Sequence, residues 1–110
     1  MNVELLWWEG CPSTQRALEA VCAALTELGL SGVQVHTREI ETDGDAQAAG
    51  FVGSPTILID GEDIVPAAAE EQIGLSCRVY HRRDGRVSPI PDPDDLREAL
   101  ERAARRAQVN

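Results

Sequence analysis

The residues of this 110-residue chain most able to do covalent chemistry are its three cysteines, Cys11, Cys22 and Cys77. Cys11 lies between an apolar segment that we expect to be a strand and a helix that we expect over residues 12–28. The free amides and the positive end of that helix would point at the sulfur and favour the thiolate, which is the nucleophilic form. The hydroxyl of Thr14 is spaced to donate a hydrogen bond to the same sulfur. We predict a reactive Cys11; the alternative is an inert cysteine packed under Trp8.

Cys22 is predicted to be structural. It lies eleven residues beyond Cys11, and a helical rise of about 1.5 Å per residue separates the two by roughly 16 Å, too far for a disulfide. It also shares the apolar stripe of Val21 and Leu25. We therefore expect Cys22 to be buried as a small hydrophobic residue.

Cys77 has two interpretations that the sequence leaves open. It is either a strand cysteine buried beside Val79 or a second reactive thiol. The segment over residues 62–74 is longer than a hairpin loop, so it has the length to fold back over the Cys11 end of the sheet. Cys77 would then resolve a mixed disulfide on Cys11 or share a soft metal with it. If its strand begins at the opposite end of the sheet, the two sulfurs stay apart.

The segments that must position these cysteines alternate between strands and helices. Residues 3–9 are apolar on both alternating faces, as in a central strand. A strand, a helix and a second strand in this order predict a parallel pair joined by a right-handed crossover. The further expected elements are a strand with Val33, Val35 and Ile40, a short helix over 43–49 ended by Gly50, a strand over 56–59, a loop over 62–74, and a strand over 77–81 ended by Asp84-Gly85.

The last helix has the clearest start. Asp92 is the expected N-cap, Pro93 lies in the first turn, and acids at the start and arginines at the end suit the helix dipole. Its expected apolar face consists of Leu96, Ala99, Leu100, Ala103 and Ala107. Together the elements predict a single α/β domain over residues 1–110 with a mixed sheet of about four strands.

Charge and composition exclude several classes of function. All ten basic residues are arginine, and the lack of lysine excludes Schiff-base chemistry and a P-loop lysine. The net charge is -9, and a body this acidic repels phosphate backbones, so we expect no nucleic-acid partner. No apolar run approaches the ~20 residues that span a bilayer, and the N-terminus lacks the basic start of a secretory signal. We expect a cytoplasmic protein with no membrane contact.

The histidines and one arginine cluster are predicted to be surface features. His36 and His81 have no spacing to a cysteine of the kind that a zinc site requires. A solvated face is the first interpretation of the arginine cluster, and a homodimer contact is the alternative; its members are Arg78, Arg82, Arg83 and Arg86.

Two motifs carry a resemblance to a known family. The run Trp-Trp-Glu-Gly-Cys-Pro-Ser-Thr at 7–14 and the run Gly-Ser-Pro-Thr at 53–56, in this order of elements, resemble the thioredoxin-like superfamily. The likeness is to small bacterial members with a Cys-Pro-x-Thr motif. Together with a third run, Gly-Leu-Ser-Cys-Arg-Val-Tyr at 74–80, the motifs also resemble short bacterial members of which some are labelled alkylmercury lyase-like. The resemblance implies a thioredoxin-like sandwich with helices on both faces of the sheet. It also implies a cis-proline at Pro55, opposite Cys11, and a backbone at Ser54 that is offered to the substrate. Thr14 stands where thioredoxins have their second cysteine, so the motif is monothiol.

We therefore expect a thiol–disulfide oxidoreductase-like protein that needs no cofactor and holds no resident metal. Its expected catalytic residues are Cys11, Thr14 and Cys77, and its expected substrate-binding residues are Trp8, Pro12, Ser54 and Pro55. The partner would be a protein disulfide or a small thiol. Two other functions remain open: a soft-metal binder that captures mercury or an organomercurial with the Cys11 and Cys77 thiolates, and a non-catalytic module that binds peptides at Pro55.

Overall fold

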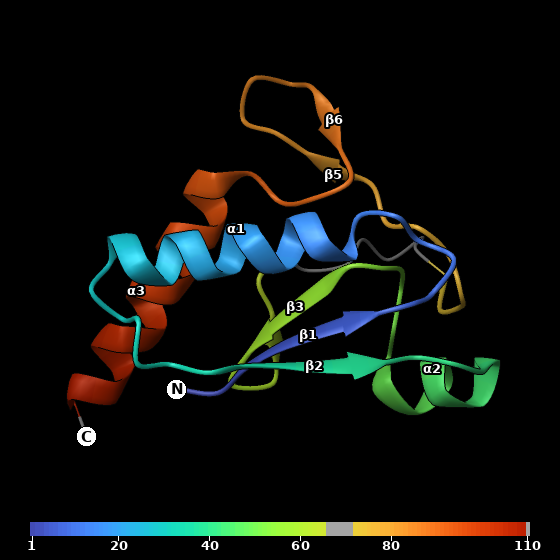
Figure 1. Cartoon of the computed structure of the whole chain (residues 1–110), viewed down its shortest axis with the longest axis horizontal. Coiled ribbons are helices and arrows are strands. Elements are labelled where there is room, and N and C mark those ends of the chain that lie inside the picture. The colour runs from blue at the N-terminus through green and yellow to red at the C-terminus, as the bar shows by residue number, and fades with distance from the viewer. Residues whose placement is uncertain (66–71, 110) are drawn as a thin grey trace.

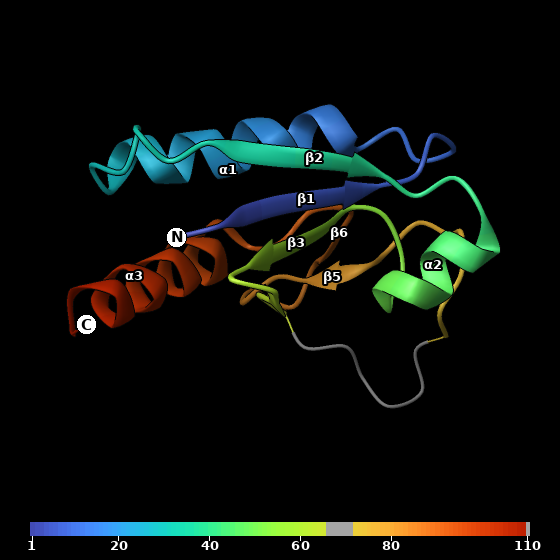
Figure 2. The same cartoon turned by 90° about the horizontal axis from the view of Figure 1, so that it is seen from below.

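The computed structural model describes residues 1–65 and 72–109, which form a mixed four-stranded sheet, a separate hairpin and three helices. The sheet has the strand order β2-β1-β3-β4, with bounds β1 Val3–Trp7, β2 Val35–Glu39, β3 Thr56–Ile59 and β4 Glu62–Asp63. β1 and β2 are parallel, whereas β3 is antiparallel to β1 and β4 is antiparallel to β3 (Figures 1 and 2). The predicted parallel pair and the predicted mixed sheet of four strands are confirmed.

Helices cover both faces of this sheet because β1 alternates its apolar side chains between two cores. Val3 and Leu5 lie in a core with α1 (Thr14–Glu27) and α3 (Pro93–Val109), which pack against each other. Leu6 points to the opposite face, into a second core with Phe51 and the short α2 (Asp43–Ala49). Figure 1 shows α1 above the strands and α2 at the lower right, beyond the end of β2.

α1 begins two residues later than predicted. The amide of Cys11 donates to the carbonyl of Trp8 at 3.0 Å, so a turn over residues 8–11 follows β1, and Pro12 comes after it and before the helix starts. The N-cap is Ser13, which makes no side-chain capping bond, and the first helical hydrogen bond runs from Ala17 N to Ser13 O at 3.0 Å. Cys11 therefore lies two residues ahead of the cap.

The expectation that Cys22 is buried is wrong, because its side chain is exposed. The face of α1 that enters the core carries Ala17, Val21, Ala24 and Leu25. Cys22 lies beside that face and one turn before the exposed Thr26, whose hydroxyl donates to the Cys22 carbonyl at 3.0 Å. The sequence pattern does not distinguish a cysteine next to the apolar stripe from a cysteine within it.

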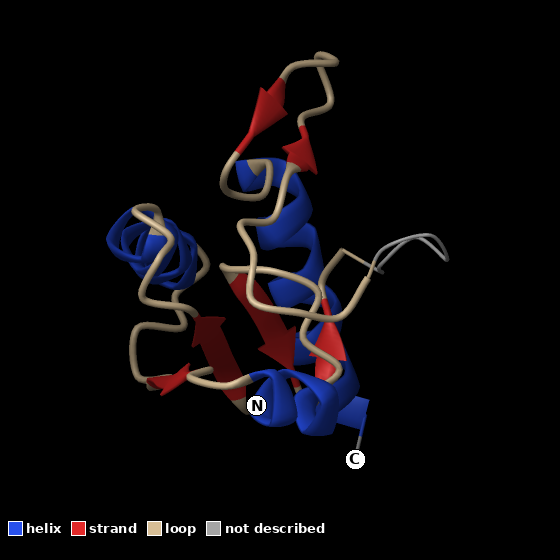
Figure 3. Cartoon of the chain, turned by 90° about the vertical axis from the view of Figure 1, so that its right-hand side faces the viewer, coloured by secondary structure: helices blue, strands red, loops and turns tan. Residues whose placement is uncertain are grey.

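The predicted strand over 77–81 is shorter than expected and does not join the main sheet. Only β5 (Tyr80–His81) is extended and paired, with β6 (Val87–Ser88), in a hairpin that stands away from the four-stranded sheet (Figure 3). Cys77 instead makes a single parallel bridge with Ser54. At the start of the expected 62–74 loop, two residues form β4, which the sequence did not indicate; residues 66–71 of that loop lie outside the described residues.

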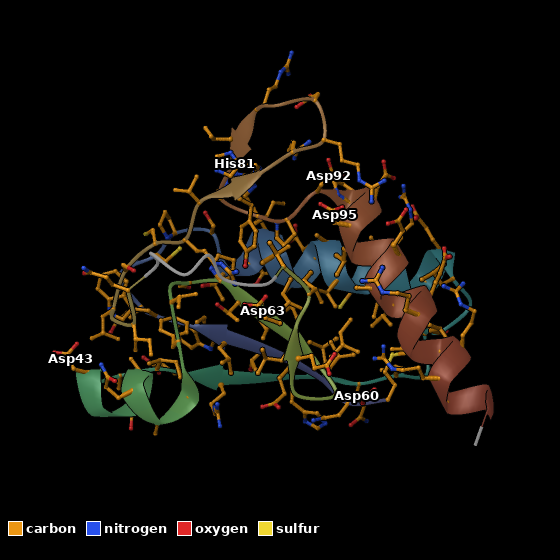
Figure 4. The ribbon with its side chains drawn as sticks, turned by 180° about the vertical axis from the view of Figure 1, so that it is seen from behind. Asp43, Asp60, Asp63, His81, Asp92 and Asp95 are labelled. Carbon is orange, nitrogen blue, oxygen red and sulfur yellow. The ribbon has the colours of Figure 1, made fainter. Side chains whose placement is uncertain are left out.

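The hairpin is tied to α3, and this helix starts as predicted. Asp92 accepts the amides of Asp94 and Arg83, both at 2.9 Å, and these two bonds lower the pKa of its carboxyl group (Figure 4). The Arg83 side chain also pairs with Asp95 at 2.8 Å and Glu98 at 2.7 Å. The predicted apolar face of α3 is buried at Leu96, Ala99, Leu100 and Ala103, whereas Ala107 is exposed.

Candidate active site

Cys11 occupies the end of the sheet where β1 passes into α1. Its side chain is buried, with 6% of its surface exposed, and its sulfur donates a hydrogen bond to the Ser54 carbonyl at 3.4 Å. Ser54 and Pro55 directly precede β3, the antiparallel neighbour of β1, so the two adjacent strands bring the Cys11 and Ser54 regions together. The Ser54–Pro55 peptide bond is cis, as the resemblance implied.

A segment far along the chain completes this site. We call residues 76–78 the strap, because they pair with both backbone groups of Ser54. The Ser54 amide donates to the Ser76 carbonyl at 2.8 Å, and the Arg78 amide donates to the Ser54 carbonyl at 2.8 Å. Gly53 makes the close approach possible: it has a φ of +144°, and a Cβ there would lie 2.9 Å from the Arg78 Cβ.

The strap brings Cys77 to Cys11. The two thiols are neighbours, and partial burial together with the adjacent Cys11 sulfur raises the pKa of the Cys77 thiol. Cys77 is nevertheless an exposed residue, so it forms the outer member of the pair and Cys11 the inner one. Of the two positions that the sequence left open for Cys77, the structure has the one beside Cys11, and the alternative of a buried strand cysteine is wrong.

Arg78 anchors the strap in the interior of the protein. Its guanidinium pairs with Asp63 at 2.7 Å (Figure 4) and donates to the Val65 carbonyl at 2.6 Å. It also lies 4.8 Å from the centroid of the Tyr80 ring, whose hydroxyl donates to the Pro55 carbonyl. The expectation of a solvated face is therefore wrong for Arg78, whose side chain is only 3% exposed. It holds for Arg83 and Arg86, which are exposed.

Two buried hydroxyls next to the cysteine pair have no hydrogen-bond partner among the described residues. They are Thr14 Oγ1, in the first turn of α1, and Ser54 Oγ. The sequence predicted a bond from Thr14 to the Cys11 sulfur, and the structure contains none. The Ser54 backbone was expected to bind the substrate. The strap already pairs with the Ser54 amide and the Ser54 carbonyl, so neither group is open to a substrate in this structure.

The remaining predicted site residues surround Cys11. Pro12 is exposed directly after it. Trp8 is half-buried against the α2-side core, with its ring over Gly10, where a Cβ would clash with the ring. His36 and His81 are exposed, as predicted. Within the described ranges, no three His, Cys, Asp or Glu side chains gather as a metal site.

The residues that sequence reasoning missed are those that hold the strap: Gly53, Asp63, Arg78 and Tyr80. A glycine just before Ser-Pro was a usable signal for a close backbone approach. The lone arginine between Cys77 and Val79 gave no sign of burial, because its acidic partner is fifteen residues earlier in the chain.

Comparison with known proteins places this site within a family. Residues 8–92 match the family described as a domain of unknown function, DUF2703. The chain belongs to the DUF2703 family. The span matched by DUF2703 runs from Trp8 to Asp92 and so contains Cys11, the strap and Ser54, but leaves out α3. Searches among curated proteins and among solved structures find no match. No helix within residues 1–65 and 72–109 is long and apolar enough to cross a membrane.

Proposed function

We propose that this protein is a thiol–disulfide oxidoreductase of thioredoxin-like fold whose working thiols are Cys11 and Cys77. The observation that carries the proposal is the contact between these two sulfurs beside the Ser54 carbonyl. Two thiols in contact are what an exchange cycle needs, because one sulfur forms a mixed disulfide and the other resolves it.

The arrangement of elements supports the thioredoxin-like part of the proposal. The strand order β2-β1-β3-β4, one parallel and two antiparallel pairs, and helices on both faces agree with what the resemblance implied. The cis peptide bond before Pro55 lies next to Cys11, as the same resemblance requires.

The proposed reaction begins at Cys11. Its sulfur lies ahead of α1 and donates to the Ser54 carbonyl, and loss of this proton gives the nucleophilic thiolate. The Cys77 thiol, whose pKa is raised, keeps its proton beside that sulfur. The Cys11 thiolate attacks one sulfur of a substrate disulfide, a Cys11–S bond forms, and the first substrate thiolate leaves and takes up a proton. Cys77 then loses its proton and attacks the Cys11 sulfur, which releases the second substrate thiol. The protein is oxidised by two electrons to a Cys11–Cys77 disulfide, and the substrate disulfide is reduced to two thiols.

The test is single-turnover reduction of bis(2-hydroxyethyl) disulfide by the reduced protein. Wild type is expected to release two equivalents of thiol per chain. Cys77→Ser is expected to release one equivalent and to retain a mixed disulfide on Cys11. Cys11→Ser is expected to lose the reaction, and the matched control Cys22→Ser, which changes an exposed cysteine outside the site, is expected to behave as wild type. Reduction that survives Cys11→Ser contradicts the proposal.

A soft-metal binder is the second candidate, and the same pair of sulfurs favours it. Two thiolates without a third His, Cys, Asp or Glu ligand in the described part of the chain suit a two-coordinate soft ion. This function requires one Hg²⁺ bound per reduced chain and loss of binding in both Cys11→Ser and Cys77→Ser. The peptide-binding module is less favoured, because the strap fills the backbone positions of Ser54 that such a peptide would use.

A further inference from the structure

A pocket of about 240 Å³ opens beside the outer cysteine. Its walls are formed by Cys77, Arg78, Val79, Val87, Ser88 and Pro89, from the strap and the β5–β6 hairpin. Val79 and Val87 are two of the large apolar side chains that the structure leaves exposed, at 57% and 66%. The apolar walls can bury the apolar part of a ligand. The Cys77 thiol beside them is the group with which a sulfur atom of that ligand would react.

The exposures of the two cysteines give them different access to molecules in solution. Cys77 is exposed, whereas Cys11 retains 6% of its surface. A thiol that arrives from solution at the oxidised site therefore has more open access to Cys77 than to Cys11, and the pocket walls lie around Cys77. In the proposed cycle Cys11 is the sulfur that meets the substrate disulfide. The two cysteines then serve two different reactants.

The charge of the chain and the volume of the pocket restrict the kinds of thiol that can bind. The chain carries a net charge of -9, which disfavours approach of anionic thiols. Arg78 in the pocket wall offers no free positive charge, because its guanidinium is paired with Asp63. A cavity of about 240 Å³ is below the range of about 300–1,000 Å³ typical of drug-sized ligands.

We propose that this pocket binds the apolar body of a small uncharged thiol, which attacks Cys77 and thereby regenerates the reduced protein. The proposal rests on the proposed function, and it adds the chemical class of the reductant and the sulfur at which it enters. Val79 directly follows the strap, and Val87 lies on β6. Both exposed valines are therefore on the hairpin side of Cys77.

The chemistry of regeneration balances without a further reactant. The thiolate RS⁻ attacks the Cys77 sulfur of the Cys11–Cys77 disulfide, an R–S–Cys77 bond forms, and Cys11 leaves as a thiolate. A second RS⁻ attacks the sulfur that the first thiol contributed to this mixed disulfide, and Cys77 leaves as a thiolate. Cys11 and Cys77 then take up the two protons that the two RSH molecules released. The products are the protein dithiol and R–S–S–R, so two molecules of RSH supply the two electrons.

The experiment measures how fast three monothiols reduce the oxidised Cys22→Ser protein: benzyl mercaptan, 2-mercaptoethanol and glutathione. Each rate constant is divided by the rate constant of the same thiol with bis(2-hydroxyethyl) disulfide, which removes intrinsic differences in nucleophilicity. Benzyl mercaptan is expected to show a normalised rate about tenfold above 2-mercaptoethanol, which corresponds to the burial of roughly two methylene groups. Glutathione is expected to be the slowest. Trapping by acid and peptide mapping should locate the benzyl adduct on Cys77.

Val87→Ser is the discriminating variant, because Val87 is exposed and its replacement leaves both cores intact. It is expected to lower the benzyl preference at least threefold, whereas Ile73→Ser, which changes an exposed apolar residue outside the pocket lining, leaves it unchanged. Equal normalised rates, an adduct on Cys11, or a preference insensitive to Val87→Ser overturns the inference. A further outcome also overturns the inference: the protein is a dimer, Val87→Ser converts it to a monomer, and the thiol preference does not change. A second copy of the chain would then be what covers the valines.

The thiol pocket at Cys77 and the Cys11–Cys77 disulfide are tested by different measurements. If no Cys11–Cys77 disulfide forms, the function itself fails. A second measurement then tests the pocket alone: labelling of the reduced wild-type protein with benzyl and 2-hydroxyethyl methanethiosulfonates. A pocket at Cys77 predicts a higher ratio of Cys77 to Cys22 labelling with the benzyl reagent, and equal ratios for the two reagents contradict it.

Discussion

At the scale of single residues, the proton on Cys77 depends on its neighbour. Partial burial is the first cause of its raised pKa, and the hydrogen bond and charge interaction with Cys11 are the second and third. In the Cys11→Ala variant the last two causes disappear and burial remains. We predict that the midpoint of Cys77 alkylation lies above the ordinary ~8.5 in the reduced wild type and moves down in Cys11→Ala. The measurement is the alkylation rate against pH, mapped by mass spectrometry.

The same raised pKa fixes how stability depends on pH. The folded protein holds the Cys77 proton more tightly than the unfolded chain, so this contribution is present below the ordinary thiol pKa and is lost as the pH rises through the raised value. Wild type should therefore lose more unfolding free energy than Cys77→Ser between pH 8 and pH 10. A larger loss in Cys77→Ser has the wrong sign and contradicts the assignment.

The Arg78–Asp63 pair is the second feature at this scale. Arg78 is 3% exposed in its side chain, so removal of Asp63 leaves a buried cation without its carboxylate. We predict that Asp63→Ala lowers the free energy of unfolding by about 3 kcal/mol, the lower end for a broken buried pair, because Asp63 itself keeps 21% exposure. Urea denaturation measures it. Glu101→Ala is the control: its pair with Arg105 spans 3.9 Å between exposed side chains, so little change is expected.

At the scale of elements, the position of the strap depends on Gly53. A Cβ at this residue would meet the Arg78 Cβ at 2.9 Å and the Arg78 backbone at 3.0 Å, and its φ of +144° is unfavourable for other residues. Gly53→Ala should displace the strap, cost about 1–3 kcal/mol, and slow formation of the Cys11–Cys77 disulfide. Gly32→Ala, at a glycine with nothing within 4 Å, should leave that rate unchanged. Equal rates of disulfide formation in the two variants would show that the strap does not position Cys77 for the disulfide.

The elements also show what the sequence could predict. Local patterns predicted α2 over 43–49, β3 over 56–59 and the Asp92 cap of α3, because period, glycine and capping residues act within a few positions. They failed for Cys22, where a one-residue shift around α1 separates the core face from solvent. They failed again for Arg78 and the strap, whose partners Asp63 and Ser54 are distant in sequence. The two cysteines of the site were singled out, whereas their contact required the fold.

At the scale of the whole molecule, the proposed disulfide would join the first strand–helix junction to the segment before the hairpin. The linked positions, 11 and 77, close a loop that spans more than half the chain. Constraint of the unfolded chain by a loop of this length corresponds to about 4 kcal/mol. We predict that the free energy of unfolding from urea denaturation is higher for the oxidised Cys22→Ser protein than for its reduced form, by an amount near this value. An oxidised form that is less stable than the reduced one means that the native fold does not accommodate the bond.

The contact between Cys11 and Cys77 determines which disulfide the folded protein can form. The folded wild-type protein is equilibrated in thiol–disulfide buffers of graded potential, quenched with acid, alkylated and mapped by mass spectrometry. We predict one intramolecular disulfide, between Cys11 and Cys77, that forms in a single two-electron transition while Cys22 stays free. Cys11 and Cys77 that are alkylated separately in every buffer, or a disulfide that joins two chains through Cys22 instead, would contradict it.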